Sequence, residues 1–236
     1  MSDLPTPPMG IALLAPPTVV VRANRLGRFV ASGLILATAA IAGLVVWQSW
    51  RSYNLVLDVV AGEPGATAAR VAAAEERATW LAWGWLGGLG LSWVAFVVWL
   101  WRARVNAGRV CDAPQRLRVR WAVLGWVVPV VNLWWPQMVV GDVHRASRPS
   151  TAARGADLTR LPASPLVTVW WAAFLAAHAV DLVAVFLLAD ESTAEAFRRV
   201  FYANCVSAGL TAIAAVAALV LMRRIDRWQD GRPAIR

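Results

Sequence analysis

The chain has 236 residues, of which 59% are hydrophobic and only 16% are charged, against roughly 25% charged residues in soluble domains, so an ordinary soluble fold is excluded. All 23 basic residues are arginine and the net charge is +9. Since the arginines stand mainly at the ends of apolar runs, where they can meet lipid phosphates, we expect a membrane protein that binds no nucleic acid.

Residues 1–28 are predicted to form a flexible cytoplasmic tail. The stretch LPTPPMGIALLAPP holds five prolines, which forbid a continuous helix. Asp3 without a nearby basic residue argues against the charged start of a signal peptide. The first apolar run would then act as an uncleaved signal-anchor.

Four apolar runs are long enough to span a bilayer, because about 20 helical residues cross a hydrocarbon core of roughly 30 Å. They are residues 29–50, 80–101, 166–189 and 201–222. The predicted fold is an all-α integral membrane protein with four transmembrane helices and one Pro-broken, re-entrant or interfacial segment. The membrane domain would cover residues 29–222, followed by a basic cytoplasmic tail, residues 223–236.

Tryptophans stand where several runs should meet the membrane interfaces. Trp and Tyr are enriched at headgroup level, so we interpret these residues as interface belts and not as a ligand cage. They are Trp47, Trp50, Trp80, Trp99, Trp101 and Trp121.

Small residues predict where helices pack closely. Gly84 and Gly88 form a G-x-x-x-G pattern in the second run, although these glycines could instead merely loosen that helix. Small residues also recur every four positions along the last run. They are Ala203, Ser207, Thr211 and Ala215.

The second run ends in Arg102, Arg104 and Asn106. We expect Arg102 and Asn106 to brace the loop around Asn132 and Pro136 by donating hydrogen bonds to its carbonyls. Ordinary anchoring at the membrane surface is the alternative for Arg104, and a helix C-cap is the alternative for Asn106.

The fifth apolar stretch, residues 121–140, carries Pro129, Asn132 and Pro136. The prolines have no N–H, so the carbonyls of Gly125 and Asn132 lack helical donors, and hydrocarbon cannot replace them. We therefore expect this segment to enter and leave on one side, with Asn132 facing protein and a new helix starting at Pro136. A proline-kinked spanning helix is the alternative.

The distribution of arginine distinguishes these two topologies. Without a fifth crossing, 18 arginines share one side and 5 lie on the other, whereas a crossing gives 11 against 12. The positive-inside rule prefers the first division. We expect a multi-pass protein of the bacterial plasma membrane with both termini in the cytoplasm.

His178 and Asp181 lie three residues apart near the middle of the third long run, a spacing that lets side chains meet. A charge at that depth costs about 2.5–3.5 kcal/mol on insertion scales, so such groups often mark a pathway or a proton relay. A hydrogen-bonded couple that only locks helices together is the alternative. Partners could come from Asn204, Ser207 and Thr211 on the last run.

The sequence predicts no metal, cofactor or enzymatic activity. His144 is expected at the cytoplasmic surface and His178 near the bilayer centre, too far apart for a shared ligand set. Cys111 and Cys205 fall on opposite sides of the membrane. No phosphate-binding glycine loop, H-E-x-x-H or G-x-S-x-G motif occurs.

Three segments together resemble a known family. They are WLWRARVNA (99–107), RWAVLGWVVPVVNLWWPQMVVGDVHRAS (120–147) and the Trp170–Trp171 pair. With the signatures W-R-A-R-x-N-A and G-W-x-x-P-x-x-N-L-W-x-P, the chain is similar over roughly residues 25–225 to an uncharacterised family of actinobacterial multi-pass membrane proteins, a domain of unknown function. The resemblance implies a membrane architecture and carries no substrate, cofactor or catalytic residue.

Two classes of function remain. The first is a structural or regulatory module that binds lipid or a partner and does no chemistry. The second is an oligomeric proton-coupled transport or ion-conducting module that uses His178 and Asp181. The expected partners are membrane lipids, with a second copy of the chain or another membrane protein as further candidates.

Overall fold

The computed structural model describes residues 20–151, 157–188 and 193–234. Within these ranges the chain is helical and has no β-strand, so the predicted all-α fold is confirmed. Four helices are long and apolar enough to cross a membrane. In chain order the helices are α1 (Arg25–Val60), α2 (Ala68–Val110), α3 (Trp121–Val127), η1 (Val131–Leu133), α4 (Trp135–Ser147), α5 (Pro165–Leu188) and α6 (Ala194–Gln229).

The long helices extend beyond the predicted spans. Helices α1 and α6 have 36 residues each and α2 has 43. At 1.5 Å per residue they measure about 54–65 Å, far more than a hydrocarbon core of about 30 Å. Hydropathy finds only the apolar middle of each helix, whereas helix ends are set by capping groups.

Side-chain caps mark where three long helices begin. Asn24 Oδ1 accepts from the backbone N–H of Gly27 at the start of α1. The hydroxyl of Thr67 accepts from Arg70 N at the start of α2, and that of Thr193 accepts from Ala196 N at the start of α6. Each cap satisfies one N–H of a first helical turn that has no partner within the helix.

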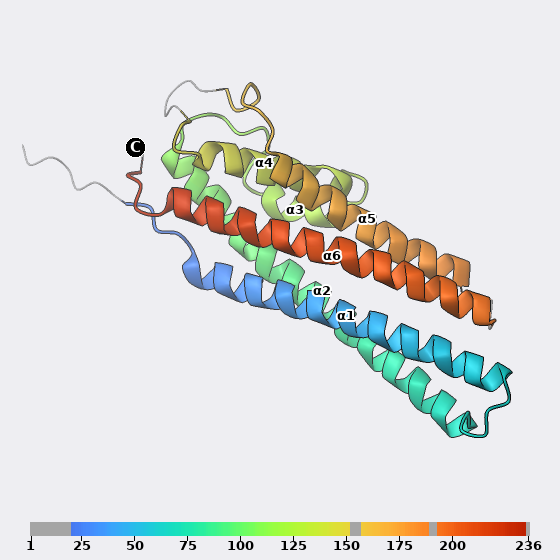
Figure 1. The fold of residues 1–236 in the computed structure, drawn as a ribbon. Coiled ribbons are helices and arrows are strands. Elements are labelled where there is room, and N and C mark those ends of the chain that lie inside the picture. Colours follow the sequence, from blue (N-terminus) through green and yellow to red (C-terminus); the bar gives the residue numbers. More distant parts are fainter. Residues whose placement is uncertain (1–19, 152–156, 189–192, 235–236) are drawn as a thin grey trace, which may run out of the picture.

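The long helices form two antiparallel hairpins that lie side by side, α1 with α2 and α5 with α6 (Figure 1). Helix α6 also packs along α1. The α1–α2 connection, the end of α5 and the start of α6 lie at one end of the bundle, which we call the distal end. Helix α4 and both ends of the described chain lie at the opposite, terminal end (Figure 1).

The two ends of the described chain are hydrogen-bonded to each other. Val21 N donates to Arg232 O over 2.8 Å, and Gly231 N donates to Val21 O over 3.1 Å. Val21 is also 2% exposed. The described ends therefore share one end of the bundle.

The boundary predicted for the amino-terminal tail was wrong. Residues 1–19 lie outside the described residues, but α1 already begins at Arg25. Arg28 Nε donates to Asp226 Oδ2 over 2.9 Å, so the start of α1 is bound to α6. The prolines that forbid a helix end at Pro17, and the sequence after them is compatible with a helix.

The predicted break in the fifth stretch is confirmed. Helix α3 ends at Val127, and α4 begins at Trp135 with Pro136 in its first turn, where a missing N–H has no consequence. The 7 residues of α3 measure about 10 Å, too short to cross the membrane. A continuous spanning helix is therefore excluded.

A tight turn reverses the chain between α3 and α4. Val131 N donates to Pro129 O over 2.8 Å, and Val130 between them has φ 68° and ψ −58°. This is the γ-turn with positive φ, which is strained for a β-branched residue. The rings of Trp121 and Trp135 meet edge to face at 4.2 Å, so the starts of the two helices lie together.

The buried core lies towards the terminal end, where α2, α4 and α6 meet. Trp99, Val143 and Met222 are fully buried there. Trp99 was predicted to be a belt residue, and this was wrong. Its indole N–H donates to Asp226 Oδ1 over 3.0 Å, because Trp99 lies on the face of α2 that packs against α6. Trp47 and Trp50 are half exposed.

Candidate functional site

A cavity of about 360 Å³ lies between α1, α2, α5 and α6, closed on one side by α3 and η1. Its walls come from the apolar middles of the four long helices. Aromatic rings make up much of this lining. They belong to Trp85, Trp93, Phe96, Trp126, Trp170 and Phe174. We call this space the aromatic cavity.

Several rings of the aromatic cavity are in contact with one another. The Phe96 ring centroid lies 5.5 Å from that of Trp170 and 5.8 Å from that of Trp126. On the other side, Phe174 lies 4.3 Å from His178. Tilted and edge-to-face pairs at these distances are favourable. They join α2, α3 and α5 into one wall.

Three polar groups in the cavity wall are hydrogen-bonded within the protein: the hydroxyls of Thr38 and Ser92 and the Nδ1 atom of His178. Thr38 Oγ1 donates to Leu34 O over 2.9 Å, so the hydroxyl of Ser92, 2.9 Å away, donates to Thr38. His178 Nδ1 lies 2.8 Å from Phe174 O. Because a carbonyl only accepts, Nδ1 carries the proton. His178 Nε2 and Trp126 Nε1 have no hydrogen-bond partner among the described residues.

Asn132 lines the aromatic cavity and is partly buried. The side chain that holds its segment in place is Trp171, whose indole N–H donates to Leu133 O over 2.7 Å. The sequence alone did not lead us to predict this contact, although the Trp170–Trp171 pair was a feature from which it could have been predicted.

The predicted brace from Arg102 and Asn106 was wrong. Arg102 Nη1 donates to Asn24 Oδ1 and Asn106 Nδ2 donates to Arg22 O, both over 3.2 Å. These side chains hold the segment before α1 and not the broken segment. Arg104 is buried, and its Nη2 donates to Leu117 O over 3.0 Å. It therefore fixes the connection after α2.

His178 and Asp181 form no hydrogen bond with each other among the described contacts. The proton of Nδ1 goes to the carbonyl of Phe174, one turn earlier. Asp181 Oδ2 is buried without a partner. Asn204, a predicted partner, donates instead to Ser49 Oγ over 2.6 Å and so links α6 to α1.

Only one of the two predicted packing glycines meets another helix. A Cβ added to Gly88 would lie 3.0 Å from Thr38 Oγ1, whereas one added to Gly84 would have no neighbour within 4 Å. Gly88 therefore allows α1 and α2 to approach, and Gly84 does not.

The predicted small-residue stripe on α6 lies against protein along part of its length. Ser207 is 6% exposed and Ala215 is 5% exposed, while Ala203 and Thr211 are partly buried. Thr211 and Ala215 line the aromatic cavity. Small side chains at these two positions leave room for it.

A buried charge cluster at the terminal end was not predicted. Asp142 of α4 accepts from Arg116, with Nη2 at 2.8 Å and Nε at 3.0 Å, and from Arg145 Nη1 at 3.3 Å. The Asp142 side chain is only 3% exposed. We call these three residues the Asp142 cluster, which fastens α4 to the connection after α2.

His144, expected at the surface, is 2% exposed. Burial, together with the nearby cations Arg148, Arg224 and Arg145, lowers the pKa of its imidazole from 6.5 to about 4. The ring lies 5.0 Å from that of Trp228. It is therefore a neutral packing residue between α4 and α6.

Comparison with known proteins gives a family but no activity. A search of curated proteins and a search of solved structures each found no match. Among the described residues no group of three His, Cys, Asp or Glu side chains could hold a metal ion. A family model described as a domain of unknown function, DUF4328, matches residues 62–227. This range holds every wall of the aromatic cavity except α1, and the chain therefore belongs to the DUF4328 family.

Proposed function

We propose that this protein is a structural or regulatory membrane module that binds an apolar, lipid-like molecule in the aromatic cavity and does no covalent chemistry. The main observation in support of this proposal is the aromatic cavity itself. Its volume of about 360 Å³ falls in the range of small-molecule sites, roughly 300–1,000 Å³.

The lining favours an apolar occupant. Aromatic and aliphatic side chains supply most of the wall, and the hydroxyls of Thr38 and Ser92 are already bonded to each other. Leu86 lines the cavity and is also 52% exposed on the outside of the bundle. A molecule dissolved in the hydrocarbon could therefore enter between the helices without crossing water.

The membrane placement belongs to the same proposal. We place the terminal end in the cytoplasm and the distal end outside the bacterial plasma membrane, because that orientation gives 18 arginines to the cytoplasmic side. The expected partners remain membrane lipids, with a second copy of the chain or another membrane protein as further candidates.

Transport is the rival proposal. The buried, unpartnered Asp181 Oδ2 favours it, since an ionisable group within a membrane helix often marks a pathway. The missing bond between His178 and Asp181 counts against a relay through that pair. Proton flux into proteoliposomes that disappears in Asp181→Asn would support transport and count against a binding module.

Two glycines of α2 allow a matched test of lipid binding. Gly90 lines the aromatic cavity and Gly84 does not, yet an added Cβ would meet nothing within 4 Å at either position. Gly90→Leu should fill part of the cavity without a clash. We expect lipid retained by the purified protein, measured by native mass spectrometry, to fall several-fold in Gly90→Leu.

Gly84→Leu is the control and should retain its lipid. Both variants should stay folded, as circular dichroism in detergent would report. Equal lipid occupancy in wild type and Gly90→Leu would remove the aromatic cavity as the binding site.

A further inference from the structure

A second hollow, of about 440 Å³, lies between α1 and α2 on the distal half of their hairpin. Unlike the aromatic cavity, its lining is rich in charged side chains. Three arginines contribute to it, Arg51 from α1 and Arg70 and Arg77 from α2, together with Trp50 and Asp58. We call these five residues the arginine notch.

The three arginines outnumber the single carboxylate of the notch, Asp58. None of them forms an ion pair with a carboxylate of the described residues, including Asp58, which shares the notch. The Arg51 guanidinium lies over the Trp47 ring at 4.9 Å, and Arg70 Nη1 donates to Gly65 O over 2.6 Å. The notch therefore has an excess of two positive charges.

Arginine is scarce on this side of the proposed topology. Only five of the 23 arginines fall there, and three of the five line the arginine notch. The other two, Arg198 and Arg199, stand in the first turns of α6. The positive-inside rule works against basic residues on the outer side. The presence of three of them at one hollow therefore points to a binding function at this place.

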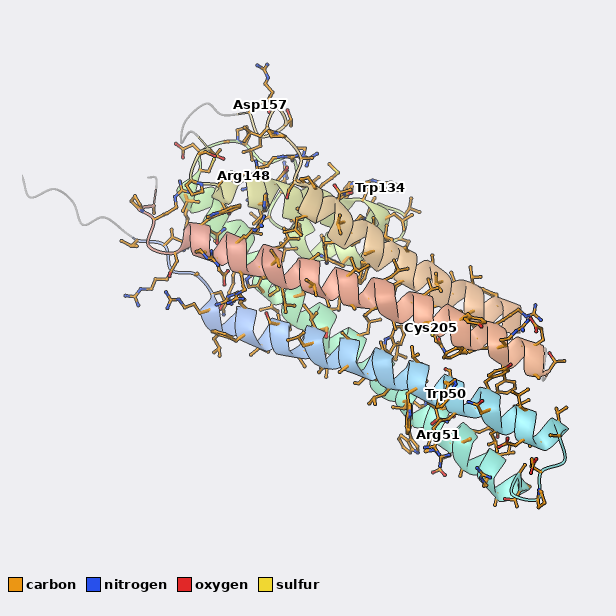
Figure 2. All side chains as sticks on the ribbon, in the orientation of Figure 1. Trp50, Arg51, Trp134, Arg148, Asp157 and Cys205 are labelled. Atoms are coloured by element: carbon orange, nitrogen blue, oxygen red, sulfur yellow. The ribbon has the colours of Figure 1, made fainter. Side chains whose placement is uncertain are left out.

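The notch lies at the level expected for lipid headgroups. Trp47 and Trp50 are half exposed, as tryptophans of an interface belt are. Figure 2 shows Trp50 and Arg51 together on the distal half of the α1–α2 hairpin. Helix α1 continues from there to Val60, about 15 Å further, so the notch stands between the apolar span and the exposed tip.

We propose that the arginine notch binds the phosphate group of a phospholipid headgroup in the leaflet facing the distal end. A guanidinium matches phosphate oxygens with two parallel N–H donors. Phosphate held by Arg51 and by Arg70 or Arg77 would join α1 to α2. Asp58 would accept from a hydroxyl or ammonium group of the same headgroup, and the Trp50 ring would lie against its glycerol.

The test uses the full chain purified in detergent. Phosphatidylglycerol, diacylglycerol with the same acyl chains, and inorganic phosphate are added separately. Thermal unfolding and native mass spectrometry report the binding. We expect phosphatidylglycerol to raise the melting temperature of the wild-type protein. In Arg51→Gln and in Arg77→Gln it should bind about tenfold more weakly than to wild type. Diacylglycerol should give no such shift.

Arg198→Gln is the matched control. It also removes one positive charge on the distal side, but this charge lies outside the notch, in an ion pair with Glu195. A loss of affinity as large as that of Arg77→Gln would overturn the assignment to the notch. A response to inorganic phosphate as large as the lipid response would overturn the assignment to lipid. The rise in melting temperature that added phosphatidylglycerol causes should persist in Gly90→Leu and be lost in Arg51→Gln, which separates the arginine notch from the aromatic cavity.

Discussion

Trp171 of α5 donates its indole N–H to the carbonyl of Leu133 over 2.7 Å. Its ring also stacks on Phe174, with 5.4 Å between the centroids and 18° between the planes. One side chain thus satisfies the carbonyl at the end of η1, between α3 and α4, and joins the aromatic rings of α5. Non-helical backbone at membrane depth requires such cover by protein.

Trp171→Phe should lower stability by about 1 kcal/mol, the usual net contribution of one hydrogen bond, because this bond is only partly buried. Phenylalanine keeps an aromatic ring beside Phe174 and removes only the N–H. Unfolding in detergent, followed by circular dichroism, measures the change. Trp134→Phe is the control, because Trp134 is 45% exposed, and a loss of the same size there would contradict the role of the Trp171 bond.

Val130→Gly should stabilise the protein. The positive φ of 68° at Val130 is strained for a β-branched side chain, and glycine removes that strain at some cost in chain entropy, for a net gain of about 0.5–1 kcal/mol. Urea unfolding in a mild detergent would measure it. The neighbouring Val131→Gly, within η1, should be destabilising, and a gain at both positions would count against the turn.

The parts of the fold that could be predicted from sequence depend on local chemistry. Apolar run length identified four spanning helices, and the missing N–H groups of Pro129 and Pro136 identified the break between α3 and α4. Both arguments need only neighbouring residues. Helix ends were less predictable, because polar turns capped by Thr67 or Thr193 carry no hydropathy signal.

The parts that could not be predicted depend on contacts between distant residues. Arg102 and Asn106 were correctly identified as donors, but only the packing of α1 against α2 determines that they meet residues 22 and 24. His178 was matched with Asp181 by spacing alone, yet the carbonyl of Phe174 competes for its proton. The aromatic cavity needs four helices to exist and has no linear signature.

Gly88→Leu should destabilise the protein by about 1–3 kcal/mol, the usual effect of overpacking. A Cβ at this position would already lie 3.0 Å from Thr38 Oγ1, so a larger side chain must separate α1 from α2. Thermal unfolding in detergent measures the loss. Gly84→Leu on the same helix should change the melting temperature little, and equal effects at both glycines would show that the contact with Thr38 is unimportant.

Asp142→Asn should be more damaging, lowering stability by about 3 kcal/mol, because removal of the carboxylate charge leaves the largely buried Arg145 cation uncompensated. Asp142 bonds Arg116 and Arg145, and the Arg145 side chain is only 11% exposed. Chemical unfolding would measure the difference. Asp157→Asn is the matched control, since its pair with Arg160 is exposed and should contribute at most about 1 kcal/mol. Similar losses in the two variants would mean that the Asp142 cluster is not structural.

Acid should weaken the contact between α4 and α6 through His144. Its pKa is lowered to about 4 in the folded protein, while the unfolded imidazole titrates near its ordinary value of about 6.5. Between these two values the unfolded chain binds a proton that the folded chain does not, so stability falls as the pH drops from about 6.5 to about 4. Arg148, Arg224 and Arg145 lie near the ring and oppose its protonation.

The melting temperature of wild type should therefore decline as the pH drops from about 6.5 to about 4. That of His144→Gln, which keeps a neutral side chain at this position, should decline less. Identical pH profiles for the two proteins would exclude His144 as the source of the slope.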